Sequence, residues 1–381
     1  MTVTGIIAEY NPFHNGHRYQ INEAKKDADA IAVVMSGSFV QRGDVAIFDP
    51  WERAQMALNN GADLVVQLPV CFSLATAERF AFGAVCLMEA LRVDKLCFGS
   101  ESGDLEALKK AALLLEQEPE PVSQKIKEYL SSGLSYPAAR AKAFTSYLEP
   151  GLLSQPNNLL AIEYLRILLR LQSPIVPQTV CRQGDGYHAA AVQSRFASAT
   201  ALRKLIAEQK DISSYTPTSL PRCSYDLSRL EAAVLSCLRF MQPDKLRTIS
   251  DVSEGLEHRI VKGAKAAVSL QDLLKKVHTK RYPDSKLRRI FLCALLNIPS
   301  GMNQKPPSYL RILGFNKKGR EILSRLKNNT TLPIITKTAD HTGDAMFDLD
   351  LRSTDLAALC ASDPAFRKGG KDFFHSPIVI P

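Results

Sequence analysis

The strongest constraint on the fold is a regular alternation of apolar and amphipathic segments in the first hundred residues. Four short runs are apolar almost throughout, and the segments between them have the spacing of helices. Such runs are typical of buried parallel strands, and the alternation favours a parallel sheet flanked by helices. The expected strands are Val3–Ala8, Ala30–Met35, Asp63–Leu68 and Asp94–Gly99, and the expected helices are Gly16–Lys26, Pro50–Asn60 and Thr76–Leu91.

The pattern becomes helical between about residues 104 and 173, which predicts a helical insertion in the α/β domain. Pro174–Arg182 is expected to return to the sheet, and Ala197–Glu208 predicts another helix. A stretch rich in Ser, Thr and Pro at Ile212–Arg222 predicts the main domain boundary. We therefore expect an α/β domain at 1–211 and a mostly helical domain at 212–381. The helices expected in the insertion are Asp104–Leu115, Val122–Ser131, Tyr136–Tyr147 and Pro156–Leu171.

The excess positive charge lies in the second half of the chain. The formal net charge is +9, yet residues 1–210 hold 21 basic and 22 acidic residues. Residues 262–327 alone hold 16 basic and 3 acidic residues. A segment of this kind favours a polyanionic partner such as nucleic acid, although a solvated helical face has a similar composition.

Composition and cysteine placement favour an ordinary globular protein of the cytoplasm. The eight cysteines form no CxxC pair and most lie in apolar stretches, so we expect buried free thiols and no zinc site. The sequence has no apolar run of about 18 residues, and its N-terminus has no basic segment or cleavage site. We therefore expect no membrane span and no secretory signal.

The most informative motif is EYNPFHNGHRY at Glu9–Tyr19, where the first expected strand turns into the first expected helix. It contains an HxGH pattern, His14-Asn15-Gly16-His17. A helix N-terminus attracts anions, and a glycine lets the backbone approach a ligand closely. Two imidazoles, which are neutral or charged near pH 7, can donate to the charge that builds on a phosphate in a transition state. The motif therefore predicts a nucleotide phosphate site.

A second motif, SATALR at Ser198–Arg203, begins a later expected helix. Ser198 and Thr200 can cap the helix and donate hydroxyls to phosphate, and Arg203 adds a guanidinium. Together with HxGH, this motif resembles the SxTxxR signature of the HIGH nucleotidylyltransferase superfamily. The resemblance implies a Rossmann-like fold and attack on the α-phosphate of a nucleoside triphosphate. Ala199 departs from the commoner SSTxxR spelling, because it replaces a hydroxyl residue.

Further stretches narrow the resemblance to the bacterial tRNA(Met) cytidine acetate ligase family. The resemblance covers about residues 1–210 and continues more weakly through KRYPDSKLRRIFLCALL, YLRILG and FDLDLRSTDL. In the first part it rests, besides EYNPFHNGH, on SGSFVQRGD, FSLATAERFAFG, FGSE, PNNLLAIEY and RQGDGYH.

The resemblance implies a reaction in two steps. ATP and acetate form acetyl-adenylate, and the acetyl group then passes to the wobble cytidine of elongator tRNA(Met). Magnesium is expected with the nucleotide, without a dedicated carboxylate site. The acetate pocket cannot be named from the sequence, but SGSFVQRGD offers candidates. Its Gln41, Arg42 and Asp44 are equally suited to contact tRNA or to shape a loop.

The site residues that the resemblance implies form two groups. His14 and His17 are expected to be catalytic. Asn158 is expected to contact ATP, but the match of the motif leaves Asn157, one position earlier, as the alternative. The expected ATP contacts are Ile7, Ala8, Glu9, Tyr10, Asn11, Pro12, Phe13, His14, Asn15, Gly16, His17, Arg18, Tyr19, Gln20, Gly99, Asn158, Arg182, Ser198, Thr200 and Arg203.

The expected tRNA contacts are basic residues of the C-terminal half, because lysine and arginine bind the nucleic-acid backbone. Tyr309 and Phe315 lie among them and are expected either in the core or stacked on an unpaired base. The basic residues are Lys275, Lys276, Lys280, Arg281, Lys286, Arg288, Arg289, Arg311, Lys317, Lys318 and Arg320.

Two other functions remain open from the sequence. A small-molecule nucleotidylyltransferase would share the HxGH chemistry but would not need the basic extension. A nucleotide-binding regulator without catalysis is disfavoured by the intact His14 and His17. The sequence leaves the oligomeric state open.

Overall fold

The computed structural model describes residues 1–183, 196–252, 255–327 and 329–381. Most of the RQGDGYH motif, from residue 184 onward, lies outside these ranges. No helix in the described ranges is long and apolar enough to cross a bilayer.

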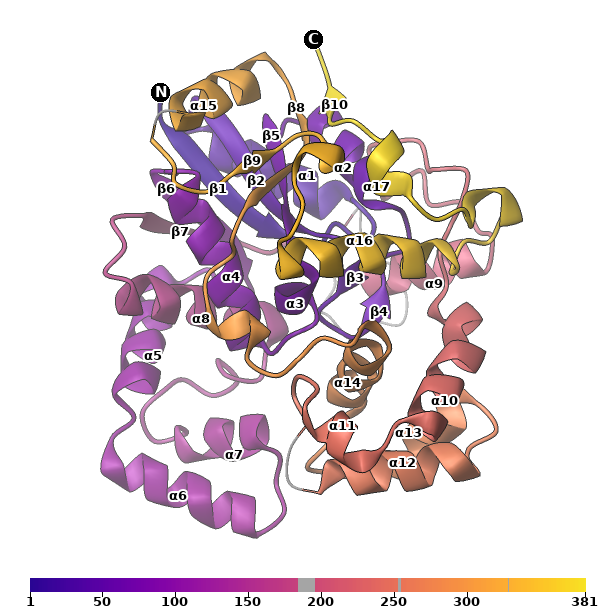
Figure 1. Cartoon of the computed structure of the whole chain (residues 1–381). Helices are drawn as coiled ribbons and strands as arrows, with labels where there is room; N and C mark the ends of the chain where they lie inside the picture. Colours follow the sequence, from indigo (N-terminus) through magenta and orange to yellow (C-terminus); the bar gives the residue numbers. More distant parts are fainter. Residues whose placement is uncertain (184–195, 253–254, 328) are drawn as a thin grey trace.

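The centre of the molecule is a largely parallel sheet, as the alternating pattern predicts (Figure 1). Five parallel strands lie in the order β5-β2-β1-β6-β7, so the segment 174–182 does return to the sheet. The bounds of β1 are the expected ones, and those of the other four strands differ by one or two residues. The strands are β1 (Val3–Ala8), β2 (Ala30–Ser36), β5 (Leu64–Leu68), β6 (Lys95–Ser100) and β7 (Val176–Cys181).

Both faces of the sheet are covered, which explains the continuous apolar runs. Ile31 and Val33 of β2 face a cluster with α1 (Asn15–Lys25) and α2 (Pro50–Asn59). Ala32 and Val34 face the opposite cluster, with α4 (Ala77–Ala90) and α8 (Pro156–Arg170). Two small elements within the first hundred residues were not expected from the sequence. They are the hairpin β3 (Phe39–Val40) and β4 (Asp44–Val45), and the short helix α3 (Val70–Ser73).

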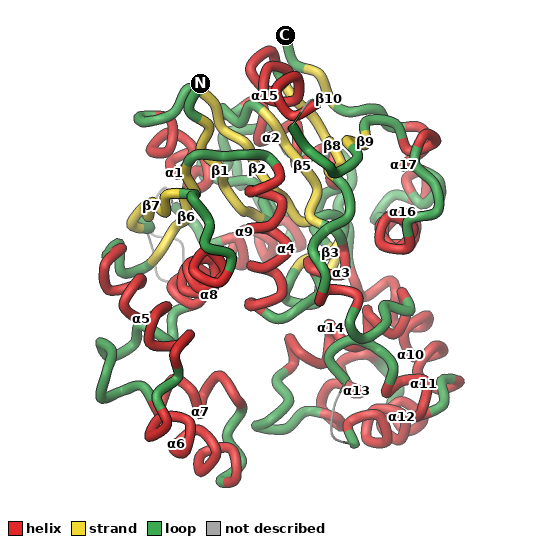
Figure 2. The backbone as a smooth tube through the Cα atoms, turned by 60° about the vertical axis from the view of Figure 1, so that its left-hand side comes forward, coloured by secondary structure: helices red, strands yellow, loops and turns green. Residues whose placement is uncertain are grey.

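Two helical lobes lie at the end of the sheet where the parallel strands finish (Figures 1 and 2). The expected insertion forms one lobe with α5 (Leu105–Gln117), α6 (Glu120–Ser131) and α7 (Tyr136–Ala143). The second lobe comes from the C-terminal half. Its helices are α10 (Glu231–Phe240), α11 (Pro243–Arg247), α12 (Leu256–Ala266), α13 (Leu270–Val277) and α14 (Asp284–Leu296).

The expected division into an α/β domain at 1–211 and a helical domain at 212–381 does not match the sheet. Strand β8 (Leu310–Phe315) pairs antiparallel with β5, and β10 (Ile378–Val379) pairs with β8. The chain therefore returns to the sheet after the second lobe, because YLRILGF is an apolar strand that needs the cover of a core. The remaining elements are α9 (Ala199–Ala207), α15 (Lys317–Lys327), β9 (Ile334–Ile335), α16 (Ala345–Ala358), α17 (Lys371–Phe374) and the short 3₁₀ helices Leu227–Leu230, Met302–Gln304, Thr338–Asp340 and Pro364–Phe366.

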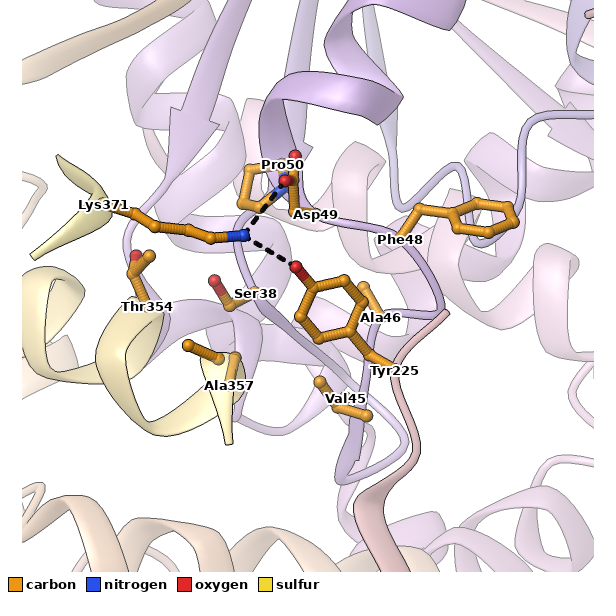
Figure 3. A pocket seen from close by; sticks show the side chains of 11 residues that line it. Ser38, Val45, Ala46, Phe48, Asp49, Pro50, Tyr225, Thr354, Ala357 and Lys371 are labelled. Atoms are coloured by element: carbon orange, nitrogen blue, oxygen red, sulfur yellow. Dashed lines mark hydrogen bonds and ion pairs between the residues drawn. The ribbon is translucent and has the colours of Figure 1, made fainter. Parts of the chain in front are cut away.

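The C-terminal segment is fastened to the start of α2. The Lys371 ammonium donates to the Tyr225 hydroxyl (2.8 Å) and lies 3.5 Å from the Asp49 carboxylate, as Figure 3 shows. The cavity beside them measures about 10 Å³, which is room for about one water molecule. This junction therefore fastens the chain and is too small to hold a ligand.

Candidate active site

The two motif histidines cap helix α1 reciprocally. His14 is the N-cap residue, and its Nδ1 accepts from the Gly16 N–H (3.1 Å). His17 lies one turn further, and its Nδ1 accepts from the His14 N–H (3.3 Å). The two rings stack with centroids 3.7 Å apart. Since Nδ1 of each ring is an acceptor, each neutral ring carries its proton on Nε2. The HxGH pattern thus leaves two Nε2–H groups to donate to a ligand.

Both rings are held in the neutral form. Burial, together with the charges of Arg182 and Arg203, lowers the pKa of His14 from its ordinary 6.5 to about 3. Burial also holds the pKa of His17 well below 6.5, with smaller contributions from His14 and Arg182. The sequence left the charge state open, and the structure assigns neutral donors.

These pKa shifts predict that acid destabilises the ligand-free protein. Because the folded pKa of His14 is about 3 and its ordinary value is 6.5, the unfolded chain binds more protons between these pH values. The free energy of unfolding should therefore fall as the pH decreases from 6.5 toward 3. Urea unfolding at several pH values measures this fall, and His14→Asn should make it less steep. An equally steep fall in that variant would contradict the assignment.

The histidines line a cavity of about 360 Å³ at the carboxyl ends of β1 and β6, where ligands bind in open α/β sheets. A smaller cavity of about 40 Å³ adjoins it beside Tyr19, Val180 and Phe196. Fifteen of the expected nucleotide contacts line one cavity or both: Ile7, Ala8, Glu9, Tyr10, Asn11, His14, Gly16, His17, Tyr19, Gln20, Gly99, Arg182, Ser198, Thr200 and Arg203. Pro12, Phe13, Asn15, Arg18 and Asn158 lie outside the lining.

The structure favours Asn157 over Asn158 as the contact in PNNLLAIEY. The Asn158 side chain is fully buried, and its Oδ1 accepts from the N–H groups of Glu101 (2.9 Å) and Ser102 (3.2 Å). It therefore fixes the loop after β6. Asn157 lines the cavity, where its Oδ1 accepts from the Arg182 guanidinium (3.1 Å).

Arginine side chains converge on the larger cavity. Ser198 caps α9, since its hydroxyl accepts from the Ala201 N–H (3.2 Å). The Thr200 hydroxyl accepts from Arg203 (3.1 Å) and from Arg42 (3.0 Å) of the SGSFVQRGD stretch. Two guanidinium groups that meet at one hydroxyl make a strongly cationic wall, which is suited to bind a triphosphate.

Helix α14 brings the second lobe to the same cavity. Ser285 and Arg289 line it, and Arg289 also binds the Gln41 carbonyl (3.4 Å) and the Asp251 carboxylate (3.0 Å). Gly43 permits α14 to approach this loop closely. Its φ is +74°, and a Cβ there would lie 2.5 Å from the backbone nitrogen of Arg289. Arg289, expected as a tRNA contact, thus borders the nucleotide cavity. Gln41 and Arg42 also line it.

A second basic cluster, Arg311, Lys317, Lys318 and Arg320, lines neither cavity. Arg311, in β8, is 4% exposed and pairs with the buried Asp372, so the expectation that it contacts tRNA is wrong. Its neighbours Tyr309 and Phe315 pack in or against the core. Lys317, Lys318 and Arg320 lie on α15, and Lys318 donates to the Asp29 carbonyl at the start of β2 (2.6 Å). They therefore lie at the amino ends of the parallel strands, whereas the histidines lie at the carboxyl ends.

Sequence reasoning missed two supports of the motif loop. The guanidinium of Arg53, fully buried in α2, donates to the carbonyls of Phe48, Glu9, Ser36 and Gly37. The segment taken for an interdomain linker also binds the loop. Its Thr216 hydroxyl donates to the Phe13 carbonyl (3.1 Å), and the Tyr215 carbonyl accepts from the Asn15 N–H (2.9 Å).

The described residues contain no group of three or more His, Cys, Asp or Glu side chains placed to hold a metal. The eight cysteines, all described, are free thiols, and of these Cys181 is exposed at the smaller cavity. The expectation of unpaired cysteines is confirmed.

Comparison with known proteins agrees with this geometry. The profile of the family described as HIGH Nucleotidyl Transferase matches residues 1–372. A tRNA(Met) cytidine acetate ligase from Caldanaerobacter subterraneus subsp. tengcongensis is 41% identical over 100% of both chains, and one from Halothermothrix orenii is 38% identical over 98% of both. A crystal structure of Thermotoga maritima TmcAL bound with alpha-thio ATP superposes with a TM-score of 0.89 at 33% identity, covering 100% of both chains. The chain therefore belongs to the HIGH nucleotidyl transferase family and, within it, to the tRNA(Met) cytidine acetate ligases.

Proposed function

We propose that the protein uses ATP to convert acetate into acetyl-adenylate and transfers the acetyl group to the wobble cytidine of elongator tRNA(Met), giving N(4)-acetylcytidine. The observation that carries this proposal is the pair of neutral, stacked histidines beside an arginine-lined cavity. Acetate attacks the α-phosphate, and pyrophosphate leaves. The two Nε2–H groups donate to the oxygens that gain charge, while Arg42, Arg182 and Arg203 hold the polyphosphate. A reaction that consumes ATP and modifies tRNA belongs to the cytoplasm.

Magnesium fits this site as a companion of the nucleotide. Glu9 is the one carboxylate side chain among the described residues that line the two cavities. A protein with so few carboxylate ligands would hold Mg²⁺ mainly through phosphate oxygens. When bound, the ion would neutralise part of the triphosphate charge, and the arginines would carry the remainder.

The apolar side chains in the cavity lining are suited to contact the acetate methyl group. Phe80, Leu160 and Tyr164 line the cavity from α4 and α8. An apolar wall of this kind favours a short acid mainly by size, since each extra methylene changes affinity by only about 1–3 kcal/mol.

Isotope exchange tests the first step. Labelled pyrophosphate should enter ATP when acetate is present and should not enter when it is absent. Propionate and a phosphorylated amine are the comparison substrates. If exchange does not require acetate but requires a phosphorylated acceptor, the protein is a small-molecule nucleotidylyltransferase and this proposal is wrong.

Binding of tRNA should depend on one basic cluster and not on the other. Lys275, Lys276, Lys280 and Arg281 are exposed on the lobe whose helix α14 borders the cavity, so we propose them as backbone contacts. Replacing the four by Gln should weaken tRNA binding and reduce the slope of log K against log salt by about 1 for each phosphate that the protein no longer neutralises. Filter binding over a salt series measures both.

The matched control removes the charges of Lys317, Lys318 and Arg320, which lie at the amino ends of the parallel strands. It should leave tRNA affinity unchanged. Weaker binding in the control and unchanged binding in the first variant would reverse the assignment. Lys286, Arg288 and Arg289 are left intact because they are partly buried, and Lys286 and Arg289 pair with Asp251.

A further inference from the structure

The larger cavity has one acidic side chain in a cationic wall. Among its described lining residues, Arg42, Arg182, Arg203 and Arg289 are cationic at neutral pH, and Glu9 alone is acidic. A carboxylate repels a triphosphate, so its presence calls for a role other than binding the phosphates.

Glu9 is held in a fixed position. It directly follows β1, in the loop that leads to the HxGH turn, and its Oε1 accepts from the Gln41 N–H (2.8 Å). Its backbone carbonyl accepts from the Arg53 guanidinium (2.6 Å). Within the described residues, no hydrogen bond to Oε2 is formed. The side chain therefore offers the cavity one oriented acceptor.

The surroundings of Glu9 are better suited to bind the base that receives the acetyl group than to bind phosphate. Tyr164 lines the same cavity as Glu9, and burial raises the pKa of its hydroxyl, with a smaller contribution from the Glu9 charge. Phe80, Phe98 and Leu160 complete this apolar region. The smaller cavity, beside Tyr19, Val180 and Phe196, adjoins the histidines through other residues and suits the adenine. Glu9 does not line that smaller cavity.

We propose that the Glu9 carboxylate accepts a hydrogen bond from the exocyclic amine of the acceptor cytosine and takes its proton during acetyl transfer. Glutamate is a natural partner for this amine, which is the cytosine donor that carboxylates recognise in nucleic acids. The assignment rests on the proposed function and gives Glu9 a role separate from the ATP contacts.

The step balances without a further reactant. The amine nitrogen attacks the carbonyl carbon of acetyl-adenylate, and a C–N bond forms. The bond between that carbon and the phosphate oxygen breaks, and AMP leaves with the electron pair. The amine proton passes to Glu9 and from there to water. Tyr164 and the apolar side chains limit the access of water, which would otherwise hydrolyse the intermediate.

The test supplies synthetic acetyl-adenylate to the full-length protein, so that the first step is bypassed. Single-turnover transfer to tRNA should fall at least about 100-fold in Glu9→Gln, the usual contribution of a general base. Reaction of the bound intermediate with hydroxylamine, a strong nucleophile that needs no base, should persist. Glu23→Gln on α1, where Glu23 pairs with Lys26, is the matched control and should transfer at the wild-type rate.

Three outcomes would overturn the assignment. Transfer by Glu9→Gln at the wild-type rate would remove Glu9 from the second step. Equal loss of transfer and of acetate-dependent exchange would make its role structural. An exchange defect in Glu9→Gln that extra Mg²⁺ restores would make Glu9 a metal ligand. Absence of acetate-dependent exchange in the wild-type protein is a different failure, because it would reject the proposed function itself.

Discussion

His14→Asn and His17→Asn should each lower acetate-dependent pyrophosphate exchange on the order of 100- to 1,000-fold, the effect of losing one preorganised donor to developing charge. Asparagine isolates this effect. Its Oδ1 occupies nearly the position of Nδ1, so it can still accept the Gly16 or His14 N–H and preserve the capping of α1. Only the Nε2–H group that faces the ligand is lost. Initial-rate exchange at saturating ATP and acetate measures the change.

Thermal unfolding shows whether the helix cap survived. Both variants should melt near the wild-type temperature, because burying a neutral histidine adds no charge interaction that asparagine would lose. His258→Asn, at an exposed position of α12, is the matched control and should exchange at the wild-type rate. If either motif variant keeps more than a tenth of the wild-type rate while remaining folded, its ring does not stabilise the transition state.

Local signals explain why the motif could be predicted so closely. An HxGH pattern at a strand-to-helix turn determines its own geometry, since the two histidines cap the helix that they begin. Apolar runs likewise identify buried strands without reference to the rest of the chain. Asn157 and Asn158 show the limit of this reasoning. Both follow Pro156 at a helix start, and only the packing of α8 decides which side chain turns into the cavity.

Features that depend on contacts between segments far apart in the chain left no local signal in the sequence. Strand β8 joins β5 across about 240 residues of chain, and nothing in YLRILGF says which sheet will receive it. Charge counting also failed at Arg311, because it ignores burial. An arginine inside an apolar run, next to Leu310 and Ile312, is better explained as a buried ion pair than as a surface contact. The position of Arg311 within the apolar run YLRILGF could have indicated that its side chain is buried.

The segment 212–222, rich in Ser, Thr and Pro, was predicted as a domain boundary for a related reason. Its composition predicts a loop, and the structure does show a loop, but a loop need not be a linker. Thr216 and Tyr215 bind the backbone of the HxGH turn, so the segment supports the loop that carries the two histidines. The same residues that make a segment irregular also leave its hydrogen-bonding groups available to support a neighbouring loop.

Arg53→Met should lower the free energy of unfolding by at least about 3 kcal/mol, because it leaves buried carbonyls without donors. The guanidinium of Arg53 joins the end of β1, through Glu9, to the end of β2, through Ser36 and Gly37. Burial lowers the pKa of Arg53 to about 10, so the side chain remains charged at neutral pH. Methionine fills a similar volume but satisfies none of these carbonyls. Urea unfolding measures the loss.

Two comparisons separate hydrogen bonding from volume. Gln55→Met, on the exposed side of the same helix, should change the unfolding free energy little. Arg53→Lys keeps the charge but presents a single ammonium, which cannot reach carbonyls on both strand ends at once; it should fall between the wild type and Arg53→Met. Equal stability of Arg53→Met and the wild type would mean that water replaces the guanidinium. In that case, the hydrogen bond from the Gln41 N–H would be enough to hold Glu9 in place. Acetyl transfer by Arg53→Met should then proceed at the wild-type rate.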